Sequence, residues 1–529
     1  MIEAQTKAQT IDRRLMGKKL FGVLGAMLLA LFVVALDSTA VSVVLNSIAD
    51  DLKADSSFIW IVSAYLLTFT TFTPIAGSLS DRLGRKIFML LGLTVFLVGS
   101  ILCGISQTMV ELIVYRAVQG IGAGIIQVIS YALLADIFPP AQVPRWQGLF
   151  GGVFGLSMLL GPTIGGWFTE HWNWRWIFFI NVPISILSIL IIIVFLKLPH
   201  KEKQATARMD WFGLFLITGM SVCLLLGFHF VEQTMAWNAD KVVFMFGAAA
   251  LLFVLFLIAE WKAIQPIIPL SLFKNRIVTM DSLISLGVGA VIIALPIYLP
   301  MIFIGILGES VTTSGTLVTP ITLMIVVGAT ISGRLLDARG KYQLLTILAS
   351  IITGGGSLLF MLIDRNVTLL PLLIYGGMMG IGIGMFLPIL RVAVQNALPA
   401  SQVGVGIGTV TYLQSLGSTI GSALLGTIMQ DAFSKKASSS LSDNVASLPP
   451  EILKKASDLQ ILQPENQTLL LNEANKAGID TSLLQSAIDA TRGALLYAIH
   501  HVFLTAGLIS ILLLICTAFL KDKALRKEF

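Results

Sequence analysis

The sequence predicts an all-α integral membrane protein with about 14 transmembrane helices, arranged as two six-helix bundles plus two inserted helices. The 529-residue chain is 56% hydrophobic and only 12% charged, with a mean hydropathy of +0.88. Soluble domains carry about 25% charged residues. Its apolar runs are about 20 residues long, the length that a helix needs to cross a bilayer. A charged motif in the first half also recurs in the second half, which indicates two related bundles.

The apolar segments give the order of the predicted helices. Six of them form the N-terminal bundle: 20–45, 58–78, 87–106, 110–135, 148–168 and 176–196. Two more, 211–231 and 242–260, form the inserted pair. The C-terminal bundle takes the last six: 277–304, 312–332, 343–363, 368–390, 403–429 and 494–519. The three cysteines, Cys103, Cys223 and Cys516, fall inside apolar runs, so we expect no disulfide framework.

The repeat sets the domain boundaries. Gly77, Leu79, Asp81 and Gly84 recur 256 residues later as Gly333, Leu335, Asp337 and Gly340. Six helices with their loops need roughly 190 residues, so this spacing leaves room for two further helices between the bundles. We therefore expect the following division: a tail at 1–19, the N-terminal bundle at 20–196, the inserted pair with linkers at 197–276, the C-terminal bundle at 277–519 and a tail at 520–529.

The distribution of charge predicts the orientation. If both termini are cytoplasmic, 24 of the 35 basic residues fall on the cytoplasmic side, whereas the short loops opposite hold only Lys53, Arg175, Lys241 and Arg365. The positive-inside rule then places both tails in the cytoplasm. The net charge of +6 is thus a topology signal, and we expect no nucleic-acid partner. The first apolar run is too long for a cleaved signal peptide, so we expect it to remain as a spanning helix.

One long polar segment, 430–493, falls on the outer side. It is mixed in charge, with six basic and eight acidic residues. Residues 451–460 and 482–496 could form short amphipathic helices. We nevertheless favour a flexible external loop.

The motif at 77–86, Gly-Ser-Leu-Ser-Asp-Arg-Leu-Gly-Arg-Lys, resembles the G-x-L-x-D-R-x-G-R-K loop of the major facilitator superfamily at every fixed position. The resemblance implies that Asp81 caps a helix N-terminus, while Arg82, Arg85 and Lys86 pair with carboxylates at nearby helix ends and act as a conformational latch. We expect Asp136 to be the partner of Arg85. Alternatively, these charges only enforce topology. In the second copy Ala338 replaces the arginine, so we expect a weaker latch there.

Two charged residues lie well inside predicted spans, where a charge is costly and therefore functional by default. They are Asp37 in the first helix and Arg116 in the fourth. Both lie roughly 9 to 12 Å from the outer end, so they share a depth. A guanidinium favours the ionised carboxylate, whereas a closed apolar site favours the neutral form, so alternating access could switch proton binding at Asp37. The alternative is a static ion pair between helices.

Two further stretches carry a family resemblance. Residues 155–166 contain Gly155, Gly161, Pro162, Gly165 and Gly166, similar to the G-P-x-x-G-G motif of antiporters of the superfamily. Small residues permit close helix contact, and proline removes one helical hydrogen bond. Residues 174–183 resemble the W-R-W-x-F-x-I-N-x-P stretch of the fourteen-helix drug:proton antiporter family. An aromatic belt at the outer interface also explains that stretch.

The chain departs from this family in two places. Ser42, Val44 and Asn46 stand where members usually have Asn, Ala and Pro in helix 1. In helix 13, Gln414-Ser415-Leu416-Gly417-Ser418 replaces a stretch that often carries an arginine, which puts a second basic coupling residue in doubt.

Polar and aromatic residues within spans are the candidates for the substrate path, although each alone is more often a packing residue. They are Tyr65, Gln127, Tyr131, Asn181, Tyr298, Tyr412 and Gln414. Adaptable apolar walls with Met, Phe and Tyr would suit lipophilic cations or amphiphiles. Asp281 and Glu309 could add negative charge, but the favoured interpretation for both is solvation at the membrane interface.

These features lead to the expectation of a proton-coupled antiporter that exports lipophilic, cationic drugs or amphiphiles and confers antibiotic resistance. The alternatives are a dedicated lipid or metabolite exporter of the same fold and a non-transporting receptor or membrane enzyme. We expect no enzyme activity, since the sequence has neither a P-loop nor a metal-ligand spacing among its five histidines. The expected energy source is the proton gradient, without cofactor or metal. We expect a monomer in a bacterial plasma membrane, a location that rests on the resemblance alone.

Overall fold

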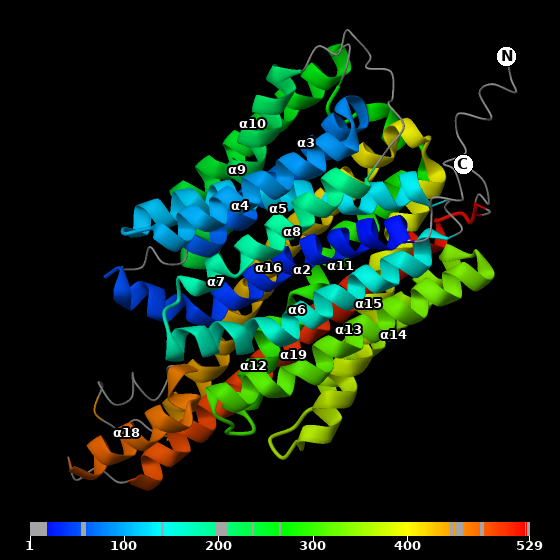
Figure 1. Cartoon of the computed structure of the whole chain (residues 1–529). Helices are drawn as coiled ribbons and strands as arrows, with labels where there is room; N and C mark the ends of the chain where they lie inside the picture. The colour runs from blue at the N-terminus through cyan, green and yellow to red at the C-terminus, as the bar shows by residue number, and fades with distance from the viewer. Residues whose placement is uncertain are drawn as a thin grey trace, which may run out of the picture.

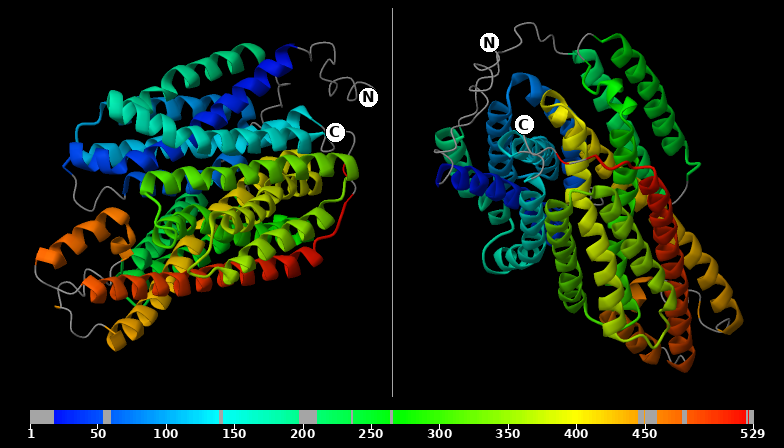
Figure 2. Two further views of the ribbon diagram at one scale, coloured as in Figure 1. Left: turned by 90° about the horizontal axis from the view of Figure 1, so that it is seen from below. Right: turned by 90° about the vertical axis from the view of Figure 1, so that its right-hand side faces the viewer.

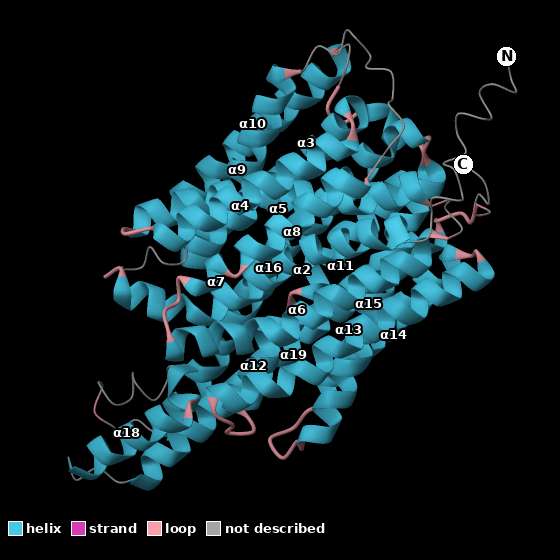
Figure 3. Ribbon diagram, viewed as in Figure 1, coloured by secondary structure: helices cyan, strands magenta, loops and turns pink. Residues whose placement is uncertain are grey.

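The protein is a bundle of long helices, as a computed structural model shows (Figure 1). The structure describes residues 18–53, 60–138, 142–196, 210–234, 237–263, 266–444, 449, 459–476, 481–523 and 525. These residues form helices and connecting loops and contain no strand (Figure 3). A helix satisfies all its backbone hydrogen bonds internally, which is what the interior of a bilayer demands. The predicted all-α class is confirmed.

The N-terminal bundle comprises five long helices and one interrupted helix. Their bounds are α2 (Lys18–Asp51), α3 (Trp60–Leu83), α4 (Arg85–Ile105), α5 (Met109–Ile137), α6 (Val143–His171), α7 (Trp176–Phe179) and α8 (Asn181–Phe195). The inserted pair is α9 (Trp211–Thr234) and α10 (Asp240–Lys262). α9 packs against α10, α3 and α16, so the pair touches both bundles.

The C-terminal bundle follows the 3-10 helix η3 (Leu270–Lys274). It contains α11 (Arg276–Ile292), α12 (Ala294–Gly305), α13 (Val311–Arg339), α14 (Tyr342–Leu359), η4 (Phe360–Leu362), α15 (Leu369–Ala397), η5 (Ala400–Gln402), α16 (Val403–Asn444) and α19 (Thr481–Ala518). Twelve helical stretches among the described residues are long and apolar enough to span a membrane. α6 and α16, with 29 and 42 residues, are also long enough and pack among them, which accounts for the predicted number of about 14.

The helix contacts repeat between the bundles. α2 packs on α6, α3 on α5 and α4 on α5; in the second bundle α11 packs on α16, α13 on α15 and α14 on α15. The two bundles meet through α3 with α16 and through α6 with α13, and they lie side by side in Figure 2. Gly84 and Gly340, which are 256 residues apart, both have positive φ, 103° and 66°. Each ends the motif helix of its bundle at a backbone angle that favours glycine.

The prediction of a flexible external loop at 430–493 is wrong for the described part of that segment. α16 continues to Asn444, the 3-10 helix η6 (Leu459–Leu462) leads into α18 (Pro464–Lys476), and α19 begins at Thr481. Buried residues from these helices share one apolar cluster: Phe433, Ala437, Leu462, Leu470, Leu484 and Ile488. This cluster stabilises a helical projection, which Figure 1 shows at the end of the bundle away from both chain ends. Residues 482–496 are helical, but as the first part of the 38-residue α19 rather than as a short helix, and 451–458 lie outside the described residues.

Candidate functional site

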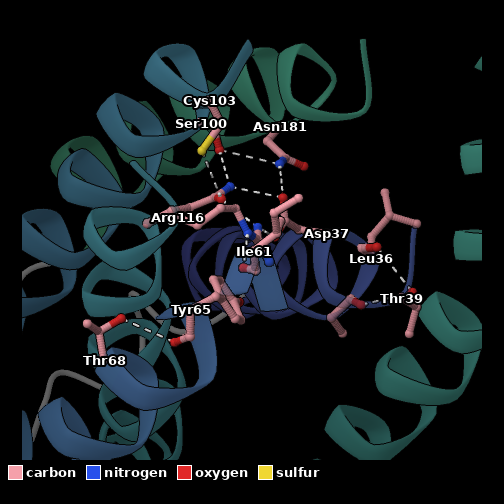
Figure 4. A network of polar contacts seen from close by, with 12 residues as sticks. Leu36, Asp37, Thr39, Ile61, Tyr65, Thr68, Ser100, Cys103, Arg116 and Asn181 are labelled. Carbon is pink, nitrogen blue, oxygen red and sulfur yellow. Dashed lines mark hydrogen bonds and ion pairs between the residues drawn. The ribbon is translucent and has the colours of Figure 1, made fainter. Parts of the chain in front are cut away.

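Asp37 lies at the centre of a buried polar network inside the N-terminal bundle (Figure 4). Its Oδ2 accepts a hydrogen bond from Arg116 Nη1 at 2.5 Å, on α5. Its Oδ1 accepts from Gln119 Nε2 and Asn181 Nδ2, both at 2.9 Å. Asp37 and Arg116 are each 1% exposed. The shared depth expected from the sequence thus corresponds to a direct ion pair, surrounded by amide donors.

The Arg116 guanidinium contacts several further groups besides Asp37. Its Nε donates to the Ile61 carbonyl at 3.3 Å, and its Nη1 also donates to Gln119 Oε1 at 2.7 Å. The Tyr65 ring lies against it, with the guanidinium carbon 4.2 Å from the ring centroid. Tyr65 therefore belongs to this network rather than to an open path. Three hydrogen bonds thus occupy the two oxygens of the Asp37 carboxylate in this conformation.

The glycines of α6 bring that helix against α2 beside Asp37. A Cβ atom at Gly161 would lie 2.0 Å from Thr39 Oγ1, and one at Gly165 would lie 2.9 Å from the Ala40 carbonyl oxygen. Further along α6, a Cβ at Gly155 would lie 1.7 Å from Val326 on α13. The C-terminal glycines of the motif, Gly161 and Gly165, therefore pack on α2, the helix that carries Asp37. Gly155, at the start of the motif, packs on α13 of the other bundle. A helix runs unbroken through Pro162, and Gly166 has open space.

The loop motif joins the two bundles at one end of the molecule, which we call the motif end. Asp81 accepts hydrogen bonds from the backbone nitrogens of Gly404 and Val405, at 3.2 and 2.9 Å. It therefore caps the N-terminus of α16, where a carboxylate is favoured by the helix dipole. A Cβ at Gly77 would lie 2.3 Å from the Gly404 carbonyl oxygen, so this glycine permits the close crossing of α3 and α16.

The basic residues of the motif connect several helix ends. Arg85 forms ion pairs with Asp81 at 2.9 Å and, as expected, with Asp136 at the end of α5. Lys86 donates to the Ile193 carbonyl at 3.0 Å. Arg82 donates to the Pro266 carbonyl at 2.5 Å, in the linker after α10. The motif thus contacts α16, α5, α8 and the linker that follows the inserted pair.

The second copy of the motif makes the matching crossing but lacks an arginine at the position of Arg82. A Cβ at Gly333 would lie 2.7 Å from the Pro144 carbonyl oxygen at the start of α6. This contact corresponds to that of Gly77 with the start of α16. Ala338 stands in the place of Arg82 and cannot form an ion pair.

Residues 174–183 begin at the end of the N-terminal bundle opposite the motif end, where they bond the end of α2 and the loop after α4. Trp174 Nε1 and Arg175 Nη1 both donate to Asp51 Oδ2, at 3.0 and 2.7 Å. These hydrogen bonds, first that of Arg175 and then that of Trp174, hold the pKa of Asp51 below its ordinary value. The neighbouring rings of Trp172 and Trp176 are exposed, as an aromatic belt requires. Asn181 from the same stretch reaches Asp37.

A cavity of about 220 Å³ lies between the bundles on the motif side. A bound water needs only about 10 to 15 Å³ of such space, so this is far larger than a packing defect. Three predicted path residues line it: Gln127, Tyr131 and Gln414. Apolar and small polar residues complete most of the wall, including Phe69, Phe154, Ile292, Ile325, Thr411 and Ser415. Arg391 is the charged side chain among these lining residues.

The remaining path candidates lie elsewhere. Tyr298 is buried in the apolar core of the C-terminal bundle, and the Tyr412 hydroxyl is 2.9 Å from the Ser221 hydroxyl on α9. Glu309 is half-buried in the loop before α13. For Asp281 the favoured interpretation of interfacial solvation is wrong, because its side chain is completely buried on α11. The polar residues Gln119, Ser100 and Arg391 were missed; Gln119 could have been found from its position one turn after Arg116.

The comparisons with known proteins agree with this fold. A family model described as Major Facilitator Superfamily matches residues 27–422. Multidrug transporter protein MdtP of Bacillus subtilis (strain 168) is 33% identical over 502 residues, covering 94% of this chain and 92% of its own. Multidrug resistance protein 3 of the same organism is 33% identical over 506 residues and 95% of each chain.

Solved structures show the same architecture at low sequence identity. The human organic anion transporter MFSD10 (TETRAN) matches with a TM-score of 0.59 and 15% identity, over 95% of this chain and 100% of its own. The proton:xylose symporter XylE matches with a TM-score of 0.59 and 13% identity, over 96% and 97%. These likenesses concern the fold alone. With the family match over most of its length, the chain belongs to the major facilitator superfamily and is a membrane transporter rather than an enzyme.

Proposed function

We propose that this protein exports lipophilic amphiphiles, cations among them, in exchange for protons by alternating access. The buried Asp37–Arg116 pair is the observation that supports it most directly. A buried ion pair contributes little net stability, since desolvation offsets much of the attraction. A carboxylate kept at that depth is therefore better explained by a part in transport, and the glycines of α6 bring that helix close to α2 beside it.

The motif end supplies the conformational element. Asp81, Arg85 and Asp136 link the N-terminal bundle to α16, and they close the cavity toward the motif end in this conformation. The excess of basic residues there supports a cytoplasmic location for this end and for both tails. The conformation described would then be the one that faces outward.

The relatives support export of drugs. Both Bacillus subtilis proteins carry multidrug names, and their similarity covers nearly the whole chain. The inserted pair and residues 174–183 support placement in the fourteen-helix drug:proton antiporter family. A bacterial plasma membrane and a role in antibiotic resistance follow from that placement, and both belong to the proposal. A monomer driven by the proton gradient, without cofactor, completes it.

The test is pH-driven exchange in proteoliposomes with ethidium as the cationic probe. We expect an imposed pH gradient to drive ethidium transport by the wild-type protein and not by Asp37→Asn. Asp431→Asn is the matched control, because Asp431 is an exposed carboxylate of the projecting α16 segment. Undiminished pH-driven transport in Asp37→Asn would contradict the proposal. A fluorescent phospholipid in place of ethidium separates multidrug export from a dedicated lipid exporter.

A further inference from the structure

The C-terminal bundle contains a buried carboxylate without a hydrogen-bond partner, Asp281 on α11. Its side chain is 0% exposed, and neither of its oxygens accepts a hydrogen bond from any described residue. The buried hydroxyls of Ser282 and Ser285 beside it are also unpaired among the described residues. An ionised carboxylate in such surroundings costs several kcal/mol, and a buried acid commonly takes up a proton instead. These surroundings favour the neutral, protonated form of the Asp281 carboxyl.

Asp281 lies on the side of α11 that reaches the cavity further along the helix, although it is not itself a lining residue. Ser285 and Ile292 follow it at spacings of four and eleven residues, which places all three on one side of α11. Ile292 lines the cavity. The titratable groups that act on Asp281 are Arg391 on α15 and Tyr342 on α14, and Tyr342 in turn bonds the segment after α19 through the Lys521 carbonyl and the Lys523 backbone nitrogen.

Arg391 contacts the other bundle and forms no ion pair with Asp281 among the described residues. Its guanidinium carbon lies 3.9 Å from the ring centroid of Tyr131 on α5, and its Nη1 donates to the Leu387 carbonyl at 3.1 Å. One turn further along α15, Gln395 Nε2 donates to the Tyr131 backbone carbonyl at 3.2 Å. Both contacts with Tyr131 cross between the bundles. They are lost together when the bundles separate at the motif end.

We propose that Asp281 is a second proton-carrying residue, switched by Arg391. When the motif end opens, Arg391 loses the Tyr131 ring and pairs with Asp281. The O–H bond of the Asp281 carboxyl then breaks, its electron pair stays on the carboxylate, and the proton passes to water at the motif end. Closure returns Arg391 to Tyr131, and Asp281 takes up a new proton from the cavity. This inference rests on the proposed antiport.

The switch also explains how a cation could enter this cavity. In the closed conformation Arg391 places a positive charge in the wall, which repels a cationic substrate. An ion pair with Asp281 neutralises that charge in the open conformation. Proton release and cation binding are then favoured in the same state, as exchange requires.

Infrared spectroscopy of the purified protein in nanodiscs tests the protonation directly. We expect the carbonyl band of a protonated carboxyl group at neutral pH in the wild type and in the control Asp431→Asn, and its loss in Asp281→Asn. Asp281→Glu should restore a band. In Asp81→Ala, which removes the cap on α16, the Asp281 band should disappear at neutral pH and should return when Arg391→Gln is added. A wild type without an Asp281 band, or an open variant that keeps it, overturns the proposal.

Transport provides the second arm. Each coupled proton multiplies the equilibrium gradient of the probe about tenfold per pH unit. We expect ethidium accumulation by Asp281→Asn to lie about tenfold below that of the wild type at one unit of imposed pH gradient. Equal accumulation contradicts a proton role for Asp281 but leaves the antiport intact. A wild type that exchanges no protons contradicts the antiport, and the infrared result then decides on Asp281 alone.

Discussion

At the scale of single residues, charge in an apolar span was the strongest signal in the sequence. It identified Asp37 and Arg116, which form a direct ion pair. It did not identify Gln119, a neutral amide one turn after Arg116, and Asn181 was expected in the substrate path rather than beside Asp37. The same reasoning misplaced Asp281, since one turn from a helix end looks like an interface until neighbouring helices are known to bury it.

The Asp37–Arg116 pair predicts strong coupling in stability. Arg116→Ala leaves an uncompensated buried carboxylate, which costs about 3 to 5 kcal/mol. Adding Asp37→Asn removes that charge, so the double variant should be more stable than Arg116→Ala alone. Unfolding of purified protein, compared in a double-mutant cycle, measures the coupling. Additive effects of the two changes would show that the pair is not energetically linked.

The Asp51 cluster predicts a pH-dependent contribution to stability. Because hydrogen bonds from Arg175 and Trp174 lower the pKa of Asp51 in the folded protein, its ionised form stabilises the fold above about pH 4. The advantage of the wild type over Asp51→Asn should be full near neutral pH and should shrink as the pH falls below that range. Melting temperatures across acidic pH check this. An advantage that grows on acidification has the wrong sign for this cluster.

At the scale of elements, length and hydropathy located the spanning helices, and the 256-residue repeat separated the inserted pair from the bundles. The segment 430–493 differs from the prediction because its polar composition hides the apolar residues by which three helices, α16, α18 and α19, extend the core of the C-terminal bundle. Which helices touch is likewise beyond the sequence. The close crossing of α6 with α2 is known only from the structure, in which Gly161 contacts Thr39.

That crossing predicts a difference between two glycines of one helix. Gly161→Ala places a methyl group against Thr39 and should destabilise the protein by about 1 to 3 kcal/mol, as overpacking does. Gly166→Ala meets open space and should be neutral or slightly stabilising, since alanine favours helix. Thermal unfolding of both variants in the same detergent gives the comparison. Equal stabilities would contradict the close crossing.

At the scale of the whole molecule, the same helix contacts occur in both bundles. The loop motif at 77–86 joins the bundles, and its copy in the second bundle matches it only in part. The charged latch lies on the N-terminal copy, where Asp81 reaches across to α16. The second copy keeps the glycine crossing but has Ala338. The loop sequence predicted this asymmetry, whereas the identity of the capped helix required the fold.

The latch predicts a change in access. Asp81→Ala removes two hydrogen bonds to the N-terminus of α16, so the motif end should open more often. A cysteine placed at Thr411 in the cavity, with the native cysteines replaced, should then react faster with a membrane-impermeant thiol reagent applied from the motif side. Glu473→Ala on α18, in the helical projection, is the control. An unchanged labelling rate would contradict a latch role for Asp81.

Proton movement driven by substrate tests the exchange itself most directly. Proteoliposomes without an initial pH gradient, containing a pH-sensitive dye, receive ethidium on one side. The wild type should move protons against the direction of ethidium, and Asp37→Asn should move ethidium, if at all, without a pH change. Proton movement by Asp37→Asn equal to that of the wild type, or proton flow in the same direction as ethidium, would contradict proton-coupled export through Asp37.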